Sequence, residues 1–371
     1  MVATLDWISL SLVPGLGLSS YWRLIDHFHS PTAVLRATGK ELLLVQGLRR
    51  QRGAGPFPLA ETLRRGQQEL DHLATIGACA LSYEDEGYPP VLRQLADPPP
   101  VLYVLGRKEL LCNTAVAIVG SRAATGYGRK IAFTLAERLS ARGLTVVSGL
   151  ALGIDAESHA GALGGKGSTV AVLGCGLDIV YPQQNSVLFR EIGERGVLVT
   201  EYPLGTRPEG FRFPARNRII AGLSKGVVVV EAAKRSGSLI TAQIALDCGR
   251  EVFAVPGHID SCKSEGTHWL LKQGAKLVQT AEDIVDELDI PDSITVSECA
   301  TAVKPAESSA LEPDALTLLN HLDTYPQQRE ELIAKIGLSP ARVSELLLCL
   351  ELDGWIEMLP GDRVRQISIL K

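Results

Sequence analysis

Hydrophobic residues follow a helical spacing from the start of the 371-residue chain to about residue 80. Residues 22–28, for example, repeat apolar side chains on one face of a helix. Short glycine turns at residues 14–17 and 46–48 separate such segments. A helix, a glycine turn and a second helix resemble a helix-hairpin-helix module, in which backbone N–H groups meet a DNA phosphate. Glycine acting only as a cap between helices is the alternative. We expect a helical domain over residues 1–80.

The pattern changes after Thr114, where short apolar segments alternate with helical ones. The expected strands cover residues 115–119, 144–147, 169–173, 197–199, 227–230 and 252–255. Short, wholly apolar strands separated by helices are typical of a parallel sheet that is covered on both faces. The sequence therefore predicts an α/β fold, a doubly wound Rossmann-like domain over residues 114–290. Residues 81–113 contain Asp97-Pro98-Pro99-Pro100, and we expect them to form a linker or an extension that packs on this core.

The pattern changes again near the C-terminus. Residues 291–312 are polar and lack periodicity, which indicates a linker. Three helices at 315–322, 330–336 and 341–352, followed by strands at 355–358 and 364–369, predict a winged helix over residues 313–371. Ser339 has the position of an N-cap for the third helix, with Pro340 as its first residue.

Composition narrows the functional classes only slightly. The N-terminus lacks the basic start of a signal peptide, and no apolar run approaches the roughly 18 residues that cross a membrane. The seven cysteines are scattered without a CxxC pair, which indicates reduced thiols and no metal site. We therefore expect a cytoplasmic protein with no membrane partner. The formal net charge of -5 argues mildly against a nucleic-acid partner unless positive charge is concentrated locally.

Positive charge is concentrated between residues 207 and 235. This window holds seven basic residues and two acidic ones, a local charge of +5. It includes the segment 211–218, in which Phe211 and Phe213 stand beside three arginines and an asparagine. Aromatic faces stack on bases and arginines hold phosphates, so the segment points to a polyanionic ligand such as single-stranded DNA. The alternative is that one phenylalanine belongs to the core and some arginines form internal ion pairs.

Two further segments are candidates for phosphate contact. The first expected strand leads into Gly120-Ser121-Arg122, which does not match the GxGxxG dinucleotide fingerprint because Arg122 takes the place of a glycine. A guanidinium there suits a two-pronged contact with a phosphate, and an ion pair with a carboxylate is the alternative. Ser236-Gly237-Ser238 would begin a helix after a later strand, where N-capping and anion binding are compatible. Both segments follow the carboxyl ends of strands, so they should converge on one edge of the sheet.

Six motifs occur in a characteristic order: residues 117–122, 148–155, 171–178 with Tyr181-Pro182, 213–218, 236–242 and 250–257. Together, over about 114–280, they resemble the DprA/Smf family of DNA processing proteins. The resemblance implies a protein without cofactor or catalytic residues that binds single-stranded DNA. It also implies dimerisation through the Rossmann-like domain. The role that the resemblance implies is protection of incoming DNA and loading of the RecA recombinase during natural transformation.

The resemblance also assigns roles to site residues. Arg122, in the loop with Gly120 and Ser121, would contact a phosphate, and Phe213 would pack on a base. The residues that would shape the pocket are Arg216, Asn217 and Arg218. The residues that would hold a second phosphate are Ser236, Gly237 and Ser238.

Two other functions fit parts of the sequence. A nucleoside-monophosphate hydrolase on a related fold reads phosphate with a PGGxGTxxE motif, but residues 239–242 supply no carboxylate after the corresponding serines. Asp155 is expected to close a turn and His159 to lie on a helix face. The second alternative is a winged-helix regulator that binds duplex DNA. Residues 310–371 carry ten acidic and six basic residues, a net charge of -4 that disfavours duplex binding.

Overall fold

The computed structural model describes residues 2–47 and 57–290. In the C-terminal part it describes residues 314–315, 318, 322, 327–336, 338–352, 356–359 and 362–366. The chain forms two compact units, residues 1–296 and residues 297–371, which we treat separately.

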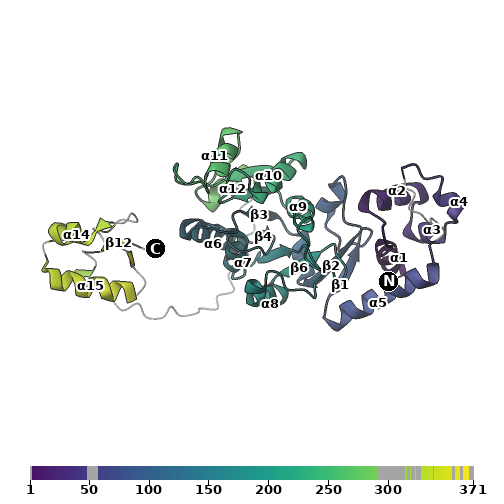
Figure 1. Cartoon of the computed structure of the whole chain (residues 1–371), viewed down its shortest axis with the longest axis horizontal. Coiled ribbons are helices and arrows are strands. Elements are labelled where there is room, and N and C mark those ends of the chain that lie inside the picture. The colour runs from purple at the N-terminus through teal and green to yellow at the C-terminus, as the bar shows by residue number, and fades with distance from the viewer. Residues whose placement is uncertain are drawn as a thin grey trace. The chain divides into compact units, whose positions relative to one another are not determined.

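A nine-stranded sheet forms the centre of the larger unit within the residues described (Figure 1). Its strands in chain order are β1 (Cys79–Ser82), β2 (Val101–Gly106), β3 (Ala115–Val119), β4 (Thr145–Ser148), β5 (Thr169–Val172), β6 (Val197–Thr200), β7 (Gly226–Val229), β8 (Glu251–Ala254) and β9 (Lys276–Leu277). The spatial order is β1-β2-β6-β5-β4-β3-β7-β8-β9, and the strands from β6 to β9 are parallel. The strand order reverses at β3, which pairs with β4 on one side and β7 on the other. The predicted doubly wound fold is therefore confirmed.

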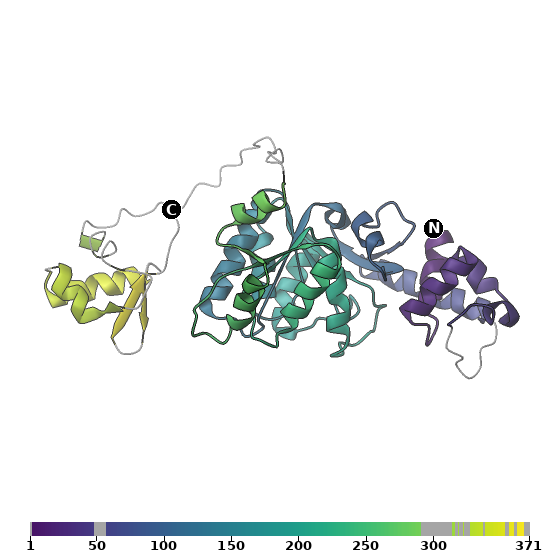
Figure 2. The same ribbon diagram turned by 90° about the horizontal axis from the view of Figure 1, so that it is seen from above.

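Helices cover both faces of the sheet (Figure 2). The helices on one face are α6 (Gly126–Ala141), α7 (Ile154–Ala162), α8 (Ser186–Arg195) and α12 (Ala281–Glu287). Those on the other are α9 (Arg212–Leu223), α10 (Gly237–Asp247) and α11 (Glu265–Lys272). Alternate residues of β3 show why this strand is wholly apolar, because Val116 and Ile118 pack toward α6 and α7 while Ala117 and Val119 pack toward α9 and α10. A strand that is buried on both faces has no place for polar side chains.

The segment between the N-terminal helices and β3 packs on the core, which was one of the two expectations for it, and in addition it contributes strands to the sheet. Together with the last residues before it, the segment supplies β1 and β2, which pair antiparallel with each other and join the sheet beside β6. Short 3-10 helices, η1 (Pro90–Gln94) and η2 (Lys108–Cys112), follow the two strands. Residues 81–113 therefore pack on the core and also extend the sheet through β2 and the end of β1.

The N-terminal helices pack directly against this added edge. They are α1 (Val2–Ser11), α2 (Leu18–Phe28), α3 (Pro31–Arg36), α4 (Gly39–Leu42) and α5 (Leu59–Thr75). Trp22 stacks edge-on against Tyr83 with ring centroids 4.8 Å apart, and its indole N–H donates to the Pro98 carbonyl at 2.8 Å. The proline run at 97–100 is thus a packing surface for α2.

The glycine turns between these helices have a conformational reason. Gly15 and Gly47 both have φ near 77°, a left-handed conformation that favours glycine. The Gly47 carbonyl also accepts a hydrogen bond from Arg23 at 2.8 Å. Leu48, the last residue of the second predicted turn, lies outside the described residues. DNA contact by these turns stays a prediction.

The smaller unit fits the predicted winged helix where it is described. Its elements are β10 (Gln327–Gln328), α14 (Arg329–Ile336), α15 (Pro340–Leu352), β11 (Ile356–Leu359) and β12 (Arg363–Gln366), with the strands ordered β10-β12-β11. Val343, Leu346 and Leu350 lie on one face of α15 and build the core of this unit. The Ser339 hydroxyl accepts from the Arg342 N–H at 3.3 Å, which confirms the predicted N-cap. Most of the helix predicted at 315–322 falls outside the described residues.

In the described parts of both units, no helix has the length and apolar character needed to cross a membrane.

Gly106 ends β2 where the antiparallel edge meets β6. Its φ is 106°, and a Cβ atom there would lie 2.5 Å from the Gly196 carbonyl oxygen. Gly274 has φ 97° and no atom within 4 Å of its Cβ position, so it is a control for backbone strain alone. We expect Gly274→Ala to lower the free energy of unfolding by about 1 to 2 kcal/mol, and Gly106→Ala by about 1 to 3 kcal/mol more. Urea denaturation measures both, and equal losses would contradict the close approach at this junction.

Candidate nucleic-acid interface

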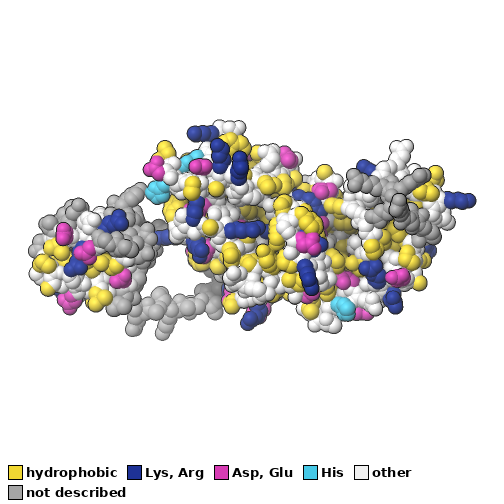
Figure 3. Space-filling view, in the orientation of Figure 1, with side chains coloured by type: hydrophobic (Ala, Val, Ile, Leu, Met, Phe, Trp, Pro, Cys, Tyr) yellow, Lys and Arg dark blue, Asp and Glu magenta, His cyan; other side chains and the backbone are white. Residues whose placement is uncertain are grey.

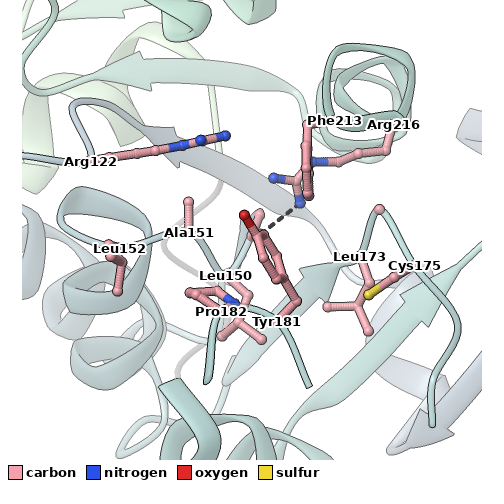
Figure 4. A pocket seen from close by; sticks show the side chains of 12 residues that line it. Arg122, Leu150, Ala151, Leu152, Leu173, Cys175, Tyr181, Pro182, Phe213 and Arg216 are labelled. Carbon is pink, nitrogen blue, oxygen red and sulfur yellow. Dashed lines mark hydrogen bonds between the residues drawn. The ribbon is translucent and has the colours of Figure 1, made fainter. Parts of the chain in front are cut away.

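A cleft of about 690 Å³ opens at the carboxyl edge of the sheet, where the strand order reverses at β3. Open α/β sheets bind ligands in this place. Nine of the ten predicted site residues line the cleft: Gly120, Ser121, Arg122, Phe213, Arg216, Asn217, Ser236, Gly237 and Ser238. A smaller inner pocket of about 70 Å³ adjoins it and shares Arg122, Ala151, Tyr181, Phe213 and Arg216 (Figure 4). Segments that are far apart in sequence therefore meet as predicted.

Arg122 is the exposed cation of this cleft. It lies in the turn that follows β3, and its guanidinium carbon is 5.6 Å from the ring centroid of Phe213. Within the described part of the chain it forms no ion pair with a carboxylate, which was the alternative considered for it. Its guanidinium is thus available to an anionic group in the cleft.

Two aromatic rings lie beside Arg122. Phe213, in the first turn of α9, stacks on Tyr181 with ring centroids 5.4 Å apart and an interplanar angle of 26°. Figure 4 shows Arg122 and Tyr181 both directed toward Phe213. Phe213 is half-buried, whereas Tyr181 is 42% exposed. Gly174 allows this arrangement, because a Cβ there would lie 2.9 Å from the Phe213 ring.

Tyr181 was given no role by the sequence analysis, although Tyr181-Pro182 was part of one motif. The signal that pointed to it was an aromatic residue followed by a proline, in a loop after a strand. The secondary structure of the predicted base-binding segment 211–218 also differs from the expectation. It was grouped with the loops, and most of it forms the first half of α9.

Arg216 lies beneath the cleft and is 4% exposed. It donates hydrogen bonds to the carbonyl oxygens of Gly149, at 2.7 Å, and of Val172. A third bond runs from its Nε to the Asn217 side chain at 3.2 Å. Loss of solvation lowers the pKa of Arg216 to about 10, and the nearby Asp155 carboxylate opposes that shift. The guanidinium therefore remains charged at neutral pH, and it joins α9 to the ends of β4 and β5.

Asp155 closes the turn after β4, as predicted. Its Oδ2 accepts from the backbone N–H groups of Gly149 at 3.1 Å and Ala151 at 3.4 Å. Burial raises the pKa of this carboxyl group, and the charge of Arg216 counteracts the rise. Gly149 is bound on both sides, since its N–H meets Asp155 and its carbonyl meets Arg216.

His159 is fully buried in α7, and its hydrogen bonds fix a neutral tautomer. Nε2 accepts from the Leu150 backbone N–H at 3.2 Å, so that nitrogen carries no proton. Nδ1 lies 2.7 Å from the Thr169 hydroxyl, which itself donates to the Val146 carbonyl, so Nδ1 is the donor. Burial, with the charge of Arg216, lowers the pKa of His159 to about 3. His159 therefore links the Leu150 loop, which lines the inner pocket, to Thr169 of β5.

Arg218 is the one predicted site residue that does not line the cleft. Its guanidinium forms a two-pronged pair with Glu201, at 3.2 and 2.7 Å, and contacts Asp97 at 3.2 Å. The Arg218 and Glu201 side chains are each 12% exposed. The expectation that Arg218 shapes the pocket is corrected: it ties α9 to the end of β6 and to the proline run. This is the internal ion pair that the sequence analysis had weighed as an alternative.

The charge count of +5 overstates the positive charge at the cleft for the same reason. Arg216 is buried, Arg218 is paired, and Arg212 lies 3.7 Å from Glu209. Lys225 precedes β7 and so lies at the opposite edge of the sheet. Figure 3 shows basic, acidic and hydrophobic side chains intermixed over one face, without a block of one sign. The exposed cations of the site segments are Arg122, Arg207, Lys234 and Arg235.

The start of α10 contributes the last wall of the cleft. Ser236 is its N-cap, accepting from the Ser238 N–H at 3.3 Å, and the two hydroxyls lie 2.7 Å apart. The predicted capping role is therefore confirmed. Anion binding at the same helix start stays a prediction.

Comparison with known proteins identifies the family that carries this arrangement. A family model described as DNA recombination-mediator protein A matches residues 80–289. The chain belongs to the DprA/Smf family. A second model, described as the DprA winged helix domain, matches residues 302–362 and confirms the predicted fold of the C-terminal unit. Membership of the DprA/Smf family supports a role in DNA processing and recombination.

Individual DprA/Smf proteins are similar over most of the chain. Protein Smf of Escherichia coli is 43% identical over 288 residues, 76% of each sequence. An X-ray structure of DNA processing protein A from Streptococcus pneumoniae is 36% identical with a TM-score of 0.65, covering 76% of this chain and 97% of that one. A structure of DNA processing protein A from Helicobacter pylori, described with its single-stranded DNA binding mode, is 33% identical with a TM-score of 0.52. It covers 56% of this chain and 95% of that one.

Neutral His159 makes stability depend on pH. The folded state holds it with a pKa of about 3, against about 6.5 when unfolded, so the unfolded state binds the extra proton between these values. The stabilisation that depends on neutral His159 is therefore fully present above about pH 6.5. As the pH decreases, the free energy of unfolding falls, by about 2 kcal/mol at about pH 5. We expect His159→Gln to be less stable at neutral pH but to lose less on acidification.

Urea denaturation at neutral and at mildly acidic pH measures this difference. The control is His27→Gln, since His27 is exposed on α2, and this variant should keep the stability of the unchanged protein at neutral pH. Equal slopes for His159→Gln and the unchanged protein would contradict the neutral state assigned to buried His159.

Proposed function

We propose that this chain binds single-stranded DNA in the cleft and acts on it without catalysis. One observation carries the proposal. A single cleft brings together an exposed guanidinium that forms no ion pair, two stacked aromatic rings and the start of a helix. Proteins that hold single strands combine cationic contacts with aromatic surfaces in this way. The single-stranded DNA binding described for the Helicobacter pylori protein supports the same function here.

Each part of the cleft has a distinct proposed task. Arg122, presented by Gly120 and Ser121, binds a phosphate, and Ser236 with the start of α10 binds another. Phe213 and the more exposed Tyr181 pack on a base. Arg216 and Asn217 are positioning residues that hold α9 against the sheet. Base recognition by sequence is not expected, since every base presents an aromatic face.

The alternative of a nucleoside-monophosphate hydrolase lacks a free acid or base. Asp155 Oδ2 accepts from two backbone N–H groups, and His159 bonds the Leu150 N–H and the Thr169 hydroxyl, so neither is placed to move a substrate proton. Among the described residues, no cluster of histidine, cysteine and acidic side chains could hold a metal ion. We therefore propose a binding protein that needs no cofactor.

The wider role that we propose is the one the family suggests. The protein would protect incoming single-stranded DNA in the cytoplasm and load RecA recombinase on it during natural transformation. A duplex-reading role for the winged helix is less well supported. Arg342, near the start of α15, is paired with Glu345 at 2.9 Å and with Asp314 at 3.6 Å, which engages its charge within the unit.

We propose that two copies associate through the surface of α10 and α11. This surface encloses a groove of about 970 Å³, and four of its apolar residues are strongly exposed: Ile240, Leu246, Ile259 and Trp269. Apolar residues gathered in this way mark protein interfaces. Ser236 and Ile240 line both the groove and the DNA cleft, so the homodimer would place two clefts close together.

Arg122→Ala tests the site. Loss of one charge-assisted phosphate contact costs about 1.5 to 3 kcal/mol, so affinity for an oligothymidylate should fall roughly tenfold to hundredfold. The slope of log affinity against log salt should decrease by about 0.7. Arg142→Ala is the control, because Arg142 is exposed at the far end of α6 and pairs with Glu282. Fluorescence anisotropy over a salt series measures both variants.

Deletion of residues 310–371 completes this test. Affinity for the single strand should remain nearly unchanged, and binding to blunt duplex should stay weaker in every form. If truncation abolished binding while folded Arg122→Ala bound normally, the DNA site would belong to the winged helix and the cleft assignment would be wrong.

Trp269→Asp tests the dimer surface. A carboxylate placed in a buried apolar interface loses its solvation, so the variant should sediment as a monomer where the unchanged protein sediments as a dimer. Leu348→Asp is the control, since Leu348 is 58% exposed in the smaller unit and Trp269 is 50% exposed. Dissociation by Leu348→Asp alone would place the interface on the winged helix instead.

A further inference from the structure

Phe211 stands at the rim of the cleft with 67% of its surface exposed. The guanidinium carbon of Arg212 lies 5.4 Å from its ring centroid and 5.2 Å from that of Tyr202. The Arg212 side chain is only 19% exposed. Phe211 is thus an exposed ring that rests on a largely buried cation, which in turn contacts a second ring.

The segment 201–211 that presents this ring is tied down along its length. The Leu204 N–H donates to Glu69 of α5 at 2.7 Å, and the Gly205 N–H donates to Asp178 at 2.9 Å. Arg212 donates to the Arg207 carbonyl at 2.6 Å. A single exposed apolar side chain is ordinary on a protein surface. A ring held by a guanidinium on an anchored segment is preorganised, so a ligand that stacks on it loses little side-chain entropy.

The position of Phe211 relates it to the cleft. Pro208, Gly210 and Phe213 all line the cleft, and Phe211 lies between them in sequence without lining it. Phe211 is the N-cap of α9 and Phe213 is in its first turn, so their Cα atoms lie about 5.5 Å apart and their side chains point to different sides of the helix. The Phe213 ring therefore lines the cleft while the Phe211 ring lies outside it. Arg207, on the same segment, is exposed and available to a phosphate between them.

We propose that Phe211 is a second base-stacking position, which takes a nucleotide of the single strand after it leaves the cleft over the segment 201–211. This inference rests on the proposed function of the cleft. Arg212 is a positioning residue that supports the ring from behind, because its charge faces Tyr202 and the segment's own carbonyl. The DNA path therefore runs beyond the pocket at Tyr181 and Phe213.

The test compares Phe211→Ala with the unchanged protein on oligothymidylates of about 4 to 16 nucleotides. Loss of one stacked base lowers affinity roughly 5- to 100-fold. The loss appears only with oligomers long enough to reach beyond the cleft, and the salt dependence stays the same because no charge is removed. Phe211→Tyr restores affinity. Phe133→Ala is the matched control, since Phe133 is 38% exposed on α6 and lines neither the cleft nor the inner pocket.

A fluorescence measurement separates stacking from a merely structural role. Phe211→Trp adds an indole at the proposed position, and its emission should be quenched by the longer oligothymidylates. Phe133→Trp should show no such change, and the unchanged protein supplies the signal of the chain's four native tryptophans. Thermal melting first establishes that each variant is folded.

The outcomes distinguish the two proposals. If Phe211→Ala binds every oligomer as the unchanged protein does while Arg122→Ala binds weakly, the second position is wrong and the cleft stands. If the unchanged protein fails to bind single strands at low salt, both proposals fail. Weaker binding by Phe211→Ala without quenching of Phe211→Trp also overturns the stacking position.

Discussion

Arg216 crosses from α9 to the ends of β4 and β5, where it donates to the carbonyl oxygens of Gly149 and Val172. These acceptors are main-chain groups at the edge where the cleft opens, so the position of the helix is fixed relative to the sheet itself. Phe213 stands one turn before Arg216 on α9, and the Leu150 loop is bound through Asp155 and His159. A buried cation with satisfied donors can hold such an arrangement, whereas an unpaired one would be very costly.

The contact between Arg216 and the carbonyl of residue 149 also explains why that residue is a glycine. A Cβ on residue 149 would lie 2.0 Å from the Arg216 guanidinium, so the side chain can cross only where none is present. Gly120 is required for a different close approach, because a Cβ there would lie 2.6 Å from Ile154 at the start of α7. Gly120 and Gly149 thus serve close packing around the cleft.

Much of the fold was predictable because strands that are buried on both faces leave a clear apolar pattern in the sequence. The core strands are wholly apolar, and their loops are forced to one edge by parallel pairing, so nine site residues could be brought together from sequence. Arg218 could not be placed, because its partners Glu201 and Asp97 are 17 and 121 residues away. Tyr181 was missed because its stacking partner Phe213 lies on another element. The edge strands β1 and β2 were missed because a proline run separates them and hides their pairing.

The N-terminal helices carry a consequence for how far this chain can be shortened. They cover Val101 and Tyr103 on one face of β2, and Glu69 of α5 is the acceptor for the Leu204 N–H. Removing them would leave two apolar residues of the sheet facing water and a backbone donor to be satisfied by solvent. A chain without these helices would therefore be expected to carry polar side chains at positions 101 and 103, which would distinguish it from a chain that keeps the helical module.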